Sequence, residues 1–331
     1  CIDNVKTQST LEITENKISN SLLELNLTRK NGKISINFLD KRNGKKYLDV
    51  LKILDIKDVG DSYNSAPKGK SSEFKLLGTK IIEKGSIRAC LRLIFEHNFK
   101  LDVFLTNLGR FFEFEAKFNN NKKNRKIQMC LKLENPIDTT FAEDAIGYIE
   151  RKHDYNWLLS ANMPAKPKIE VKTNSYPMQR WVIAQDLGVM TLGLNYYEIY
   201  KNELKITLIR GTARISEPKN PARYIPAGPP IETPDLQCLG FQKLNFAVSI
   251  NLDIASIQQD VEEFYQPTVA VLGNFKQICS KKFLDLPENL IFYGLKPTYN
   301  KCFGVFYNSG NKNIIFKKKT IAPKTIEFIE L

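Results

Sequence analysis

An acidic loop with a tyrosine is the first place where residue types and spacing in this chain suit chemistry. Segment 55–67 reads DIKDVGDSYNSAP and places Asp58, Asp61 and Tyr63 around Gly60. Carboxylates accept hydrogen bonds from hydroxyl groups, and an aromatic ring packs on the apolar face of a sugar, so the loop suits a carbohydrate. The commoner use of Asp, Asn and Gly in such a loop is a turn held by side-chain hydrogen bonds to the backbone, and the residues alone favour that interpretation.

A group of arginines forms the second candidate site. Arg210 ends an alternating segment, 204–210, and Arg214 and Arg223 follow it. A guanidinium at a strand end can hold a polar ligand, or it can pin the carbonyl groups of a loop. From the residues alone we expect the second role.

Other catalytic and metal-binding patterns are absent from the sequence. The two histidines, His97 and His153, stand alone without metal-type spacing, which indicates surface or turn positions rather than ligands. There is no GxSxG, P-loop or GxGxxG motif, and no histidine is suggested as the partner of a cysteine nucleophile. We therefore expect neither catalytic residues nor metal ligands in this chain.

Composition and charge exclude two classes of protein. With 331 residues, of which 42% are hydrophobic and 26% charged, the chain reads as soluble and globular, with a sizeable core. No apolar run approaches the ~18–20 residues that span a membrane, so we expect no membrane association. The net charge of +13 comes mostly from lysines spread along the chain, with 317–319 as the densest run, so we expect no nucleic-acid partner.

The cysteines bear on the cellular compartment of the protein, and the first residue bears on whether the chain is part of a longer product. The six cysteines form no CxxC pair, and Cys90 and Cys130 lie in apolar strand patterns, where a free thiol acts as a small core residue. We therefore expect reduced thiols and a cytoplasmic protein. Because the chain begins with Cys1 and not with methionine, we expect a piece of a longer product, with a bacterial lipoprotein that starts at a cysteine as the alternative.

The elements that must position these residues are strands. Apolar and polar residues alternate with a period of two, as in 111–118, where Phe112, Phe114 and Ala116 share one face. Asn-Gly pairs at 31–32 and 43–44 predict tight turns. One segment, 255–265, has apolar residues at helical spacing instead. The segments expected to be strands are 21–28, 33–39, 87–95, 101–106, 111–118, 127–133, 181–184, 196–200, 204–210, 244–250, 290–295, 303–307, 314–317 and 325–329.

This pattern predicts an all-β fold with more strands than a simple sandwich needs. A polar, proline-bearing segment at 164–177 is where we place a boundary between two sets of sheets. A second proline-rich segment follows the strand 204–210 and contains six of the 15 prolines, so it can be neither helix nor interior strand. Its apolar residues, such as Ile231 and Leu236, predict an ordered, stiff surface loop.

Taken in order, these segments resemble the C-terminal β-region of glycoside hydrolase family 38, the α-mannosidases. The resemblance begins at 13–47, which is similar to the opening hairpin and glycine turn of the family, and continues with VGDSY at 59–63 before a proline. YYEIYKNELKITLIR at 196–210 resembles the stretch that ends in the family's arginine. The most specific match is AGPPIETPDLQCLG at 227–240, followed by Phe246-Ala247-Val248, and 294–296 with 307–308 resembles the final strands.

The resemblance implies a galactose-mutarotase-like supersandwich with an additional smaller β-sheet region, formed by residues 1–331 as one unit. It further implies that Tyr63, Arg210, Asp61 and Gly228 line a substrate cleft for an α-mannoside. The nucleophile, the acid/base and the zinc ion of the family belong to an N-terminal catalytic domain, which is the implied partner. This chain would then support the catalytic domain and be inactive alone, binding no cofactor itself.

Two positions depart from the family pattern, and two other functions remain as alternatives. Gln242 and Phe306 stand near positions where the family often has histidine and arginine, which leaves the subfamily open. A stand-alone carbohydrate-binding module that has lost its catalytic partner is the first alternative. An aldose epimerase is the second, from fold analogy alone, and the isolated histidines argue against it.

Overall fold

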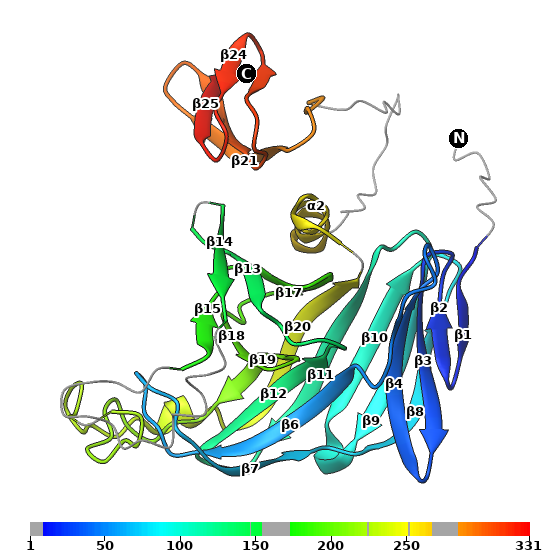
Figure 1. Ribbon diagram of the computed structural model, residues 1–331, viewed down its shortest axis with the longest axis vertical. Helices are drawn as coiled ribbons and strands as arrows, with labels where there is room; N and C mark the ends of the chain where they lie inside the picture. Colours follow the sequence, from blue (N-terminus) through cyan, green and yellow to red (C-terminus); the bar gives the residue numbers. More distant parts are fainter. Residues whose placement is uncertain (1–8, 146, 154–172, 224, 251, 267–283) are drawn as a thin grey trace.

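The computed structural model describes residues 9–145, 147–153, 173–223, 225–250, 252–266 and 284–331. Over these residues the regular elements are almost all antiparallel strands, which confirms the all-β fold class (Figure 1). The helices of the described ranges are α2 (Ile254–Tyr265), as predicted from its spacing, and two 3₁₀ turns, η1 (Glu96–Asn98) and η2 (Pro234–Gln237). In these ranges no helix has the length and apolar character needed to cross a bilayer.

Three sheets form the body of the molecule. In pairing order, the nine-stranded sheet consists of β14 (Tyr148–Lys152), β13 (Thr139–Glu143), β16 (Trp181–Ala184), β17 (Leu187–Thr191), β20 (Gly240–Ile250), β11 (Phe111–Asn120), β10 (Lys100–Thr106), β9 (Arg88–Phe95) and β8 (Leu76–Lys84). The six-stranded sheet consists of β15 (Ser175–Pro177), β18 (Tyr196–Tyr200), β19 (Glu203–Arg210), β12 (Arg125–Lys132), β6 (Leu51–Asp58) and β7 (Pro67–Glu73). The five-stranded sheet consists of β1 (Glu12–Thr14), β2 (Lys17–Ser19), β3 (Leu23–Lys30), β4 (Lys33–Asp40) and β5 (Lys46–Tyr47).

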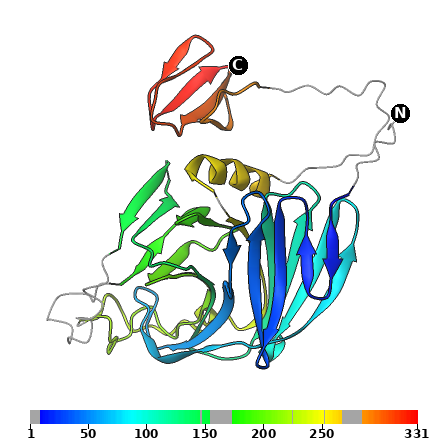
Figure 2. The ribbon, with the colours of Figure 1, turned by 45° about the vertical axis from the view of Figure 1, so that its right-hand side comes forward.

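The C-terminal residues form two small sheets of their own. One has the order β21 (Leu290–Pro297), β22 (Cys302–Asn308), β25 (Ile326–Glu330), and the other pairs β23 (Ile314–Phe316) with β24 (Lys319–Ile321). Figures 1 and 2 both place these sheets beyond α2, on the far side of the helix from the body. Lys324 joins them to the body, because its ammonium donates to the hydroxyl of Tyr148 at 3.1 Å and lies 4.5 Å from the centre of that ring.

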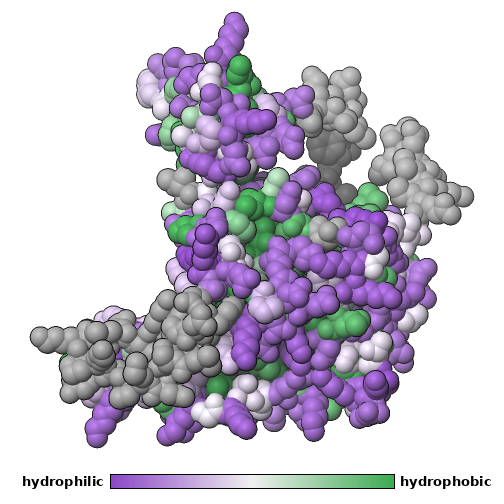
Figure 3. Space-filling view, in the orientation of Figure 1, coloured by the Kyte–Doolittle hydropathy of each residue, from purple (hydrophilic) through white to green (hydrophobic). Residues whose placement is uncertain are grey.

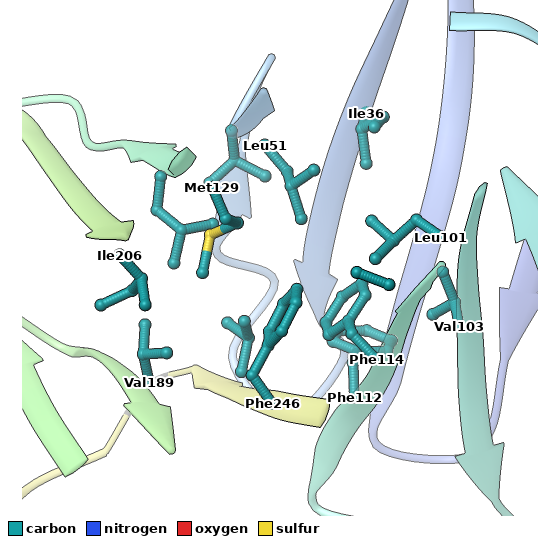
Figure 4. Packing of buried hydrophobic residues seen from close by; sticks show 14 of the residues in the cluster. Ile36, Leu51, Leu101, Val103, Phe112, Phe114, Met129, Val189, Ile206 and Phe246 are labelled. Atoms are coloured by element: carbon teal, nitrogen blue, oxygen red, sulfur yellow. The ribbon is translucent and has the colours of Figure 1, made fainter. Parts of the chain in front are cut away.

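One apolar core lies between the three sheets of the body (Figure 4). Phe112, Phe114 and Ala116 are buried on the same face of β11, as their alternation predicts. Phe114 stacks on Phe246 of β20 with ring centres 5.2 Å apart. The next residue of β20, Ala247, points to the opposite face of the sheet, where it packs in a second apolar cluster with Val261 of α2.

Several local predictions are confirmed. Asn31 and Gly32 turn the chain between β3 and β4, with φ of 51° and 76°, the left-handed conformation that Asn-Gly turns favour. Cys90 and Cys130 are buried, and burial raises the pKa of each thiol to about 12, as befits inert core residues. The boundary expected at 164–177 begins outside the described residues, and its described end forms the edge strand β15.

Candidate functional site

The two candidate loops lie at one edge of the six-stranded sheet. Strands β6 and β19 both pair antiparallel with β12, so they run in the same direction and end on either side of the start of β12. The acidic loop, residues 59–66, follows β6, and the proline-rich loop, residues 211–239, follows β19. Two segments that are far apart in the sequence therefore meet at this edge.

Asp58, at the end of β6, fixes the acidic loop from within. Its side chain is buried, and one carboxylate oxygen accepts hydrogen bonds from the backbone N–H of Gly60 at 2.8 Å and of Ala66 at 3.0 Å. The other oxygen accepts from the hydroxyl of Ser65 and from Nε of Arg210, the latter at 3.1 Å. Burial alone would raise the pKa of Asp58, but the Arg210 guanidinium and these hydrogen bonds outweigh it and lower the pKa.

Asp61 and Arg223 form a buried ion pair between the two loops. The carboxylate of Asp61 accepts a bidentate pair of hydrogen bonds from the guanidinium of Arg223, and both side chains are almost fully shielded from solvent. The same carboxylate accepts from the backbone N–H of Tyr63, Asn64 and Glu217, at 3.0, 3.0 and 2.7 Å. Burial alone would raise the pKa of Asp61, but these partners outweigh burial and lower the pKa, so the carboxylate stays ionised.

Arg210 pins the acidic loop, which is the role expected from the residues. One terminal nitrogen of its guanidinium donates to the backbone carbonyl of Asp61, while Nε donates to the carboxylate of Asp58. Its side chain is 19% exposed, so the guanidinium lies just beneath the surface. The turn held by Asp side chains, which the residues favoured over a sugar site, is also confirmed by the bonds of Asp58 and Asp61 to Gly60, Tyr63 and Asn64.

Tyr63 is the member of the set that faces solvent. It is 56% exposed, and its ring lies over the guanidinium of Arg223, 5.8 Å from the ring centre. Gly228 of the proline-rich loop lies against this tyrosine, since a Cβ at residue 228 would be 3.2 Å from the Tyr63 hydroxyl oxygen. The structure thus brings all four predicted cleft residues together, with Tyr63 at the surface and Asp61 enclosed behind it.

One buried cation of this site was missed by sequence reasoning, and the partner of a second was not predicted. Lys126 of β12 is 1% exposed, and its ammonium lies 2.5 Å from the carboxylate of Glu198 and 3.0 Å from the hydroxyl of Ser65. No signal in the sequence indicates its burial, because alternation puts Lys126 on the face of β12 opposite the core residues Ile127 and Met129. Arg223 was noted only as a neighbour of Arg210, because nothing in the local sequence shows that its partner is Asp61.

The expectation that both histidines are surface or turn residues is half wrong. His97 is exposed in the turn η1 with φ of 59°, which confirms it. His153 is buried, because strands far from it in sequence cover it: its Nε2 lies 2.9 Å from the Thr140 hydroxyl of β13, and its ring packs beside Tyr176 of β15. Its Nδ1 is buried without a hydrogen-bond partner among the described residues.

This buried histidine makes stability depend on pH. Burial and the nearby Arg151 lower the pKa of His153 from 6.5 to about 4, so in the unfolded chain the imidazole binds its proton at higher pH than in the fold. Protonation therefore favours unfolding as the pH falls from 6.5 towards 4, and we expect the free energy of unfolding to drop by up to about 3 kcal/mol across this range. Urea titrations at several pH values measure it.

The matched control for this prediction is His153→Phe, which keeps a ring but cannot titrate. We expect its free energy of unfolding to be nearly flat over the same pH range. Asp58 and Asp61 do not interfere with this comparison, because a carboxylate with a lowered pKa loses its stabilising effect only when the pH falls below its unfolded-state pKa of about 3.9. If the free energy of unfolding depended on pH in the same way in the parent and in His153→Phe, the assignment of this dependence to His153 would be contradicted.

A metal centre is not formed by the part of the chain that the structure describes. No group of three or more His, Cys, Asp or Glu side chains in these residues is arranged to hold a metal ion. The residues described do not fit the zinc ion that the resemblance implies, and we derive no chemical step through zinc from them.

Comparison with known proteins places most of the chain, including the acidic loop, in a family. The family model for the glycosyl hydrolases family 38 C-terminal domain matches residues 18–215, which include Tyr63 and Arg210 but not Arg223 or Gly228. None of the curated proteins matches the chain.

Two solved structures share the fold. The chain superposes on an alpha-mannosidase from Enterococcus faecalis V583 with a TM-score of 0.73 at 15% identity, covering 98% of this chain and 43% of that one. A protein in the glycosyl hydrolase family 38 from Enterococcus faecalis gives the same TM-score and identity, with 98% and 45% coverage. The chain thus spans less than half the length of these structures. Together with the family match, this shows that the chain belongs to the glycosyl hydrolase family 38 C-terminal domain family.

Proposed function

We propose that this chain is the C-terminal region of an α-mannosidase and that it forms one wall of the mannoside cleft. The catalytic machinery would lie in an N-terminal domain that packs against this region, and the chain alone would be inactive. The observation that carries the proposal is the family match, because the matched residues contain Tyr63 and Arg210 at one sheet edge.

Within this proposal the loop residues have different roles. Tyr63 is the group that touches the sugar, because its exposed ring offers a face for the apolar side of a pyranose. Arg223 and Asp61 act as positioning residues, since they hold the backbone of the tyrosine loop and the ring itself. Gly228 leaves room for the Tyr63 hydroxyl.

Neither loop aspartate serves as a nucleophile in this proposal. Retaining glycosidases need two carboxyl groups about 5 Å apart, one to attack the sugar and one to transfer a proton. Asp58 and Asp61 are buried, and all four of their oxygens accept hydrogen bonds. Bond cleavage and the zinc ion, which would contact mannose hydroxyls, are therefore assigned to the partner domain.

A second candidate is a stand-alone carbohydrate-binding module, favoured by the exposed ring of Tyr63. An NMR titration with methyl α-mannoside separates the two candidates. If the chain alone forms a complete site, millimolar sugar shifts the ring signals of Tyr63, and Tyr63→Ala abolishes the effect. We expect those signals to stay unmoved, because a cleft with one wall gives few contacts to a single sugar.

A further inference from the structure

A cleft separates α2 from the C-terminal sheets, and its described lining residues all lie outside the two loops of the Tyr63 site. Its volume is about 700 Å³, and residues of α2 form one wall while the start of β21 forms the other. Figure 3 shows the C-terminal sheets standing apart from the body at this place, above the position of α2. The volume lies within the ~300–1,000 Å³ range of small-molecule sites.

Gln258 of α2 contributes to the wall of this cleft and is the unusual residue in it. The side chain is only 3% exposed, and neither its amide nitrogen nor its amide oxygen has a hydrogen-bond partner among the described residues. Buried polar groups are nearly always hydrogen-bonded, and one that is not destabilises the fold. The amide of Gln258 therefore has unused hydrogen-bonding capacity at the wall of the cleft.

The other lining residues define what the cleft can bind. Carboxylates and amides dominate the α2 side, with Asp253, Gln259 and Glu262, the last paired with Arg180, and no lysine or arginine occurs among the described lining residues. This composition disfavours an anion. No metal-holding group of His, Cys, Asp or Glu occurs in the described ranges, which disfavours a metal ion.

An apolar surface completes the cleft. Ile291 and Phe292 of β21, both partly exposed, line the wall opposite α2, which also carries Asn289. A ligand that presents hydroxyl groups to one side and C–H groups to the other matches both walls, since hydroxyls can donate to carboxylates and both donate to and accept from an amide.

We propose that this cleft is a second ligand site, separate from the Tyr63 loops, which binds a neutral polyhydroxylated molecule such as a sugar through Gln258. The amide of Gln258 has donor and acceptor groups free for two hydroxyls of one ring. Binding satisfies both groups, and the apolar wall covers the C–H face of the ring. The inference does not depend on the proposed mannosidase role, because it concerns other residues and requires no catalysis.

Ligand-observed saturation-transfer NMR on the full chain tests the site. The probes are methyl α-mannoside, methyl α-glucoside and methyl β-galactoside, with 1,5-diaminopentane as a cationic ligand of similar size. We expect saturable binding of at least one glycoside with a Kd of about 1–10 mM and no binding of the diamine. Gln258→Leu should weaken glycoside binding at least tenfold, and Gln258→Ala, which adds no bulk, gives the same test if the leucine variant does not fold.

Two control variants locate the binding. Gln179→Leu makes the same change at an exposed glutamine outside the cleft, and Tyr63→Ala removes the ring of the other loops. Both should bind the glycoside as the parent does. The inference is overturned if no glycoside binds saturably, if Gln258 variants bind as tightly as the parent, if Tyr63→Ala alone abolishes binding, or if the diamine binds in preference.

Discussion

Replacing Arg223 with leucine should lower the free energy of unfolding by about 3–5 kcal/mol. Arg223 and Asp61 have side chains 4% and 0% exposed, so the substitution leaves a buried carboxylate without its counter-charge. The cost arises from this uncompensated buried charge. It does not measure how much the ion pair stabilises the parent, because burying the two charges offsets part of that stabilisation. Urea denaturation of the parent and the variant, followed by circular dichroism, measures the difference.

Arg214 provides the matched control, because it belongs to the same loop. It is 36% exposed, and its guanidinium lies 3.5 Å from Glu217 and 3.6 Å from Glu232, so Arg214→Leu should cost less than about 1 kcal/mol. Adding Asp61→Asn to Arg223→Leu should recover part of the loss, since the buried charge is then removed. Equal effects of the two arginine substitutions would show that the two loops are not joined as described.

The second large effect is expected in the core. Phe246 of β20 is fully buried and stacks on Phe114 with an angle of 12° between the rings, so Phe246→Ala removes many contacts and leaves a cavity. A truncation of this kind costs about 3–5 kcal/mol in the free energy of unfolding. The same denaturation experiment measures it.

Phe241 lies on the same strand and gives the comparison. It is 68% exposed, and Phe241→Ala should change the free energy of unfolding by no more than about 0.5 kcal/mol. Similar losses for both substitutions would mean that β20 does not present Phe246 to the core and Phe241 to solvent in the register described.

Alternation predicted many of the strands that have one face more buried than the other, but β6 and β8 were not among the expected strands. β11 and β19 show this alternation, and their expected bounds lie close to the observed ones. β17, with the sequence LGVMT, was missed because it is buried on both faces, against the core and against α2, so no alternation arises. β7 was missed for the opposite reason: every residue of PKGKSSE is exposed, and only pairing with β6 makes it a strand.

The sequence indicated several residues of the candidate site but not how they are arranged. The sequence singled out Asp61, Tyr63 and Arg210, and the fold brings them together. That Asp61 is enclosed while Tyr63 is exposed depends on the proline-rich loop, whose Arg223 pairs with Asp61, a residue 162 positions earlier. His153 was misjudged for the same reason, because Thr140 and Tyr176 cover it from other strands.

Hydrolysis of 4-nitrophenyl α-mannoside by the purified chain tests the central claim most directly. The assay compares the chain with and without added zinc, and uses the alpha-mannosidase from Enterococcus faecalis V583, whose fold it shares in part, as the positive control. We predict no release of nitrophenol above buffer in either condition, since Asp58 and Asp61 hold their carboxylates in buried hydrogen bonds. Turnover that rises in proportion to the concentration of pure protein would contradict it.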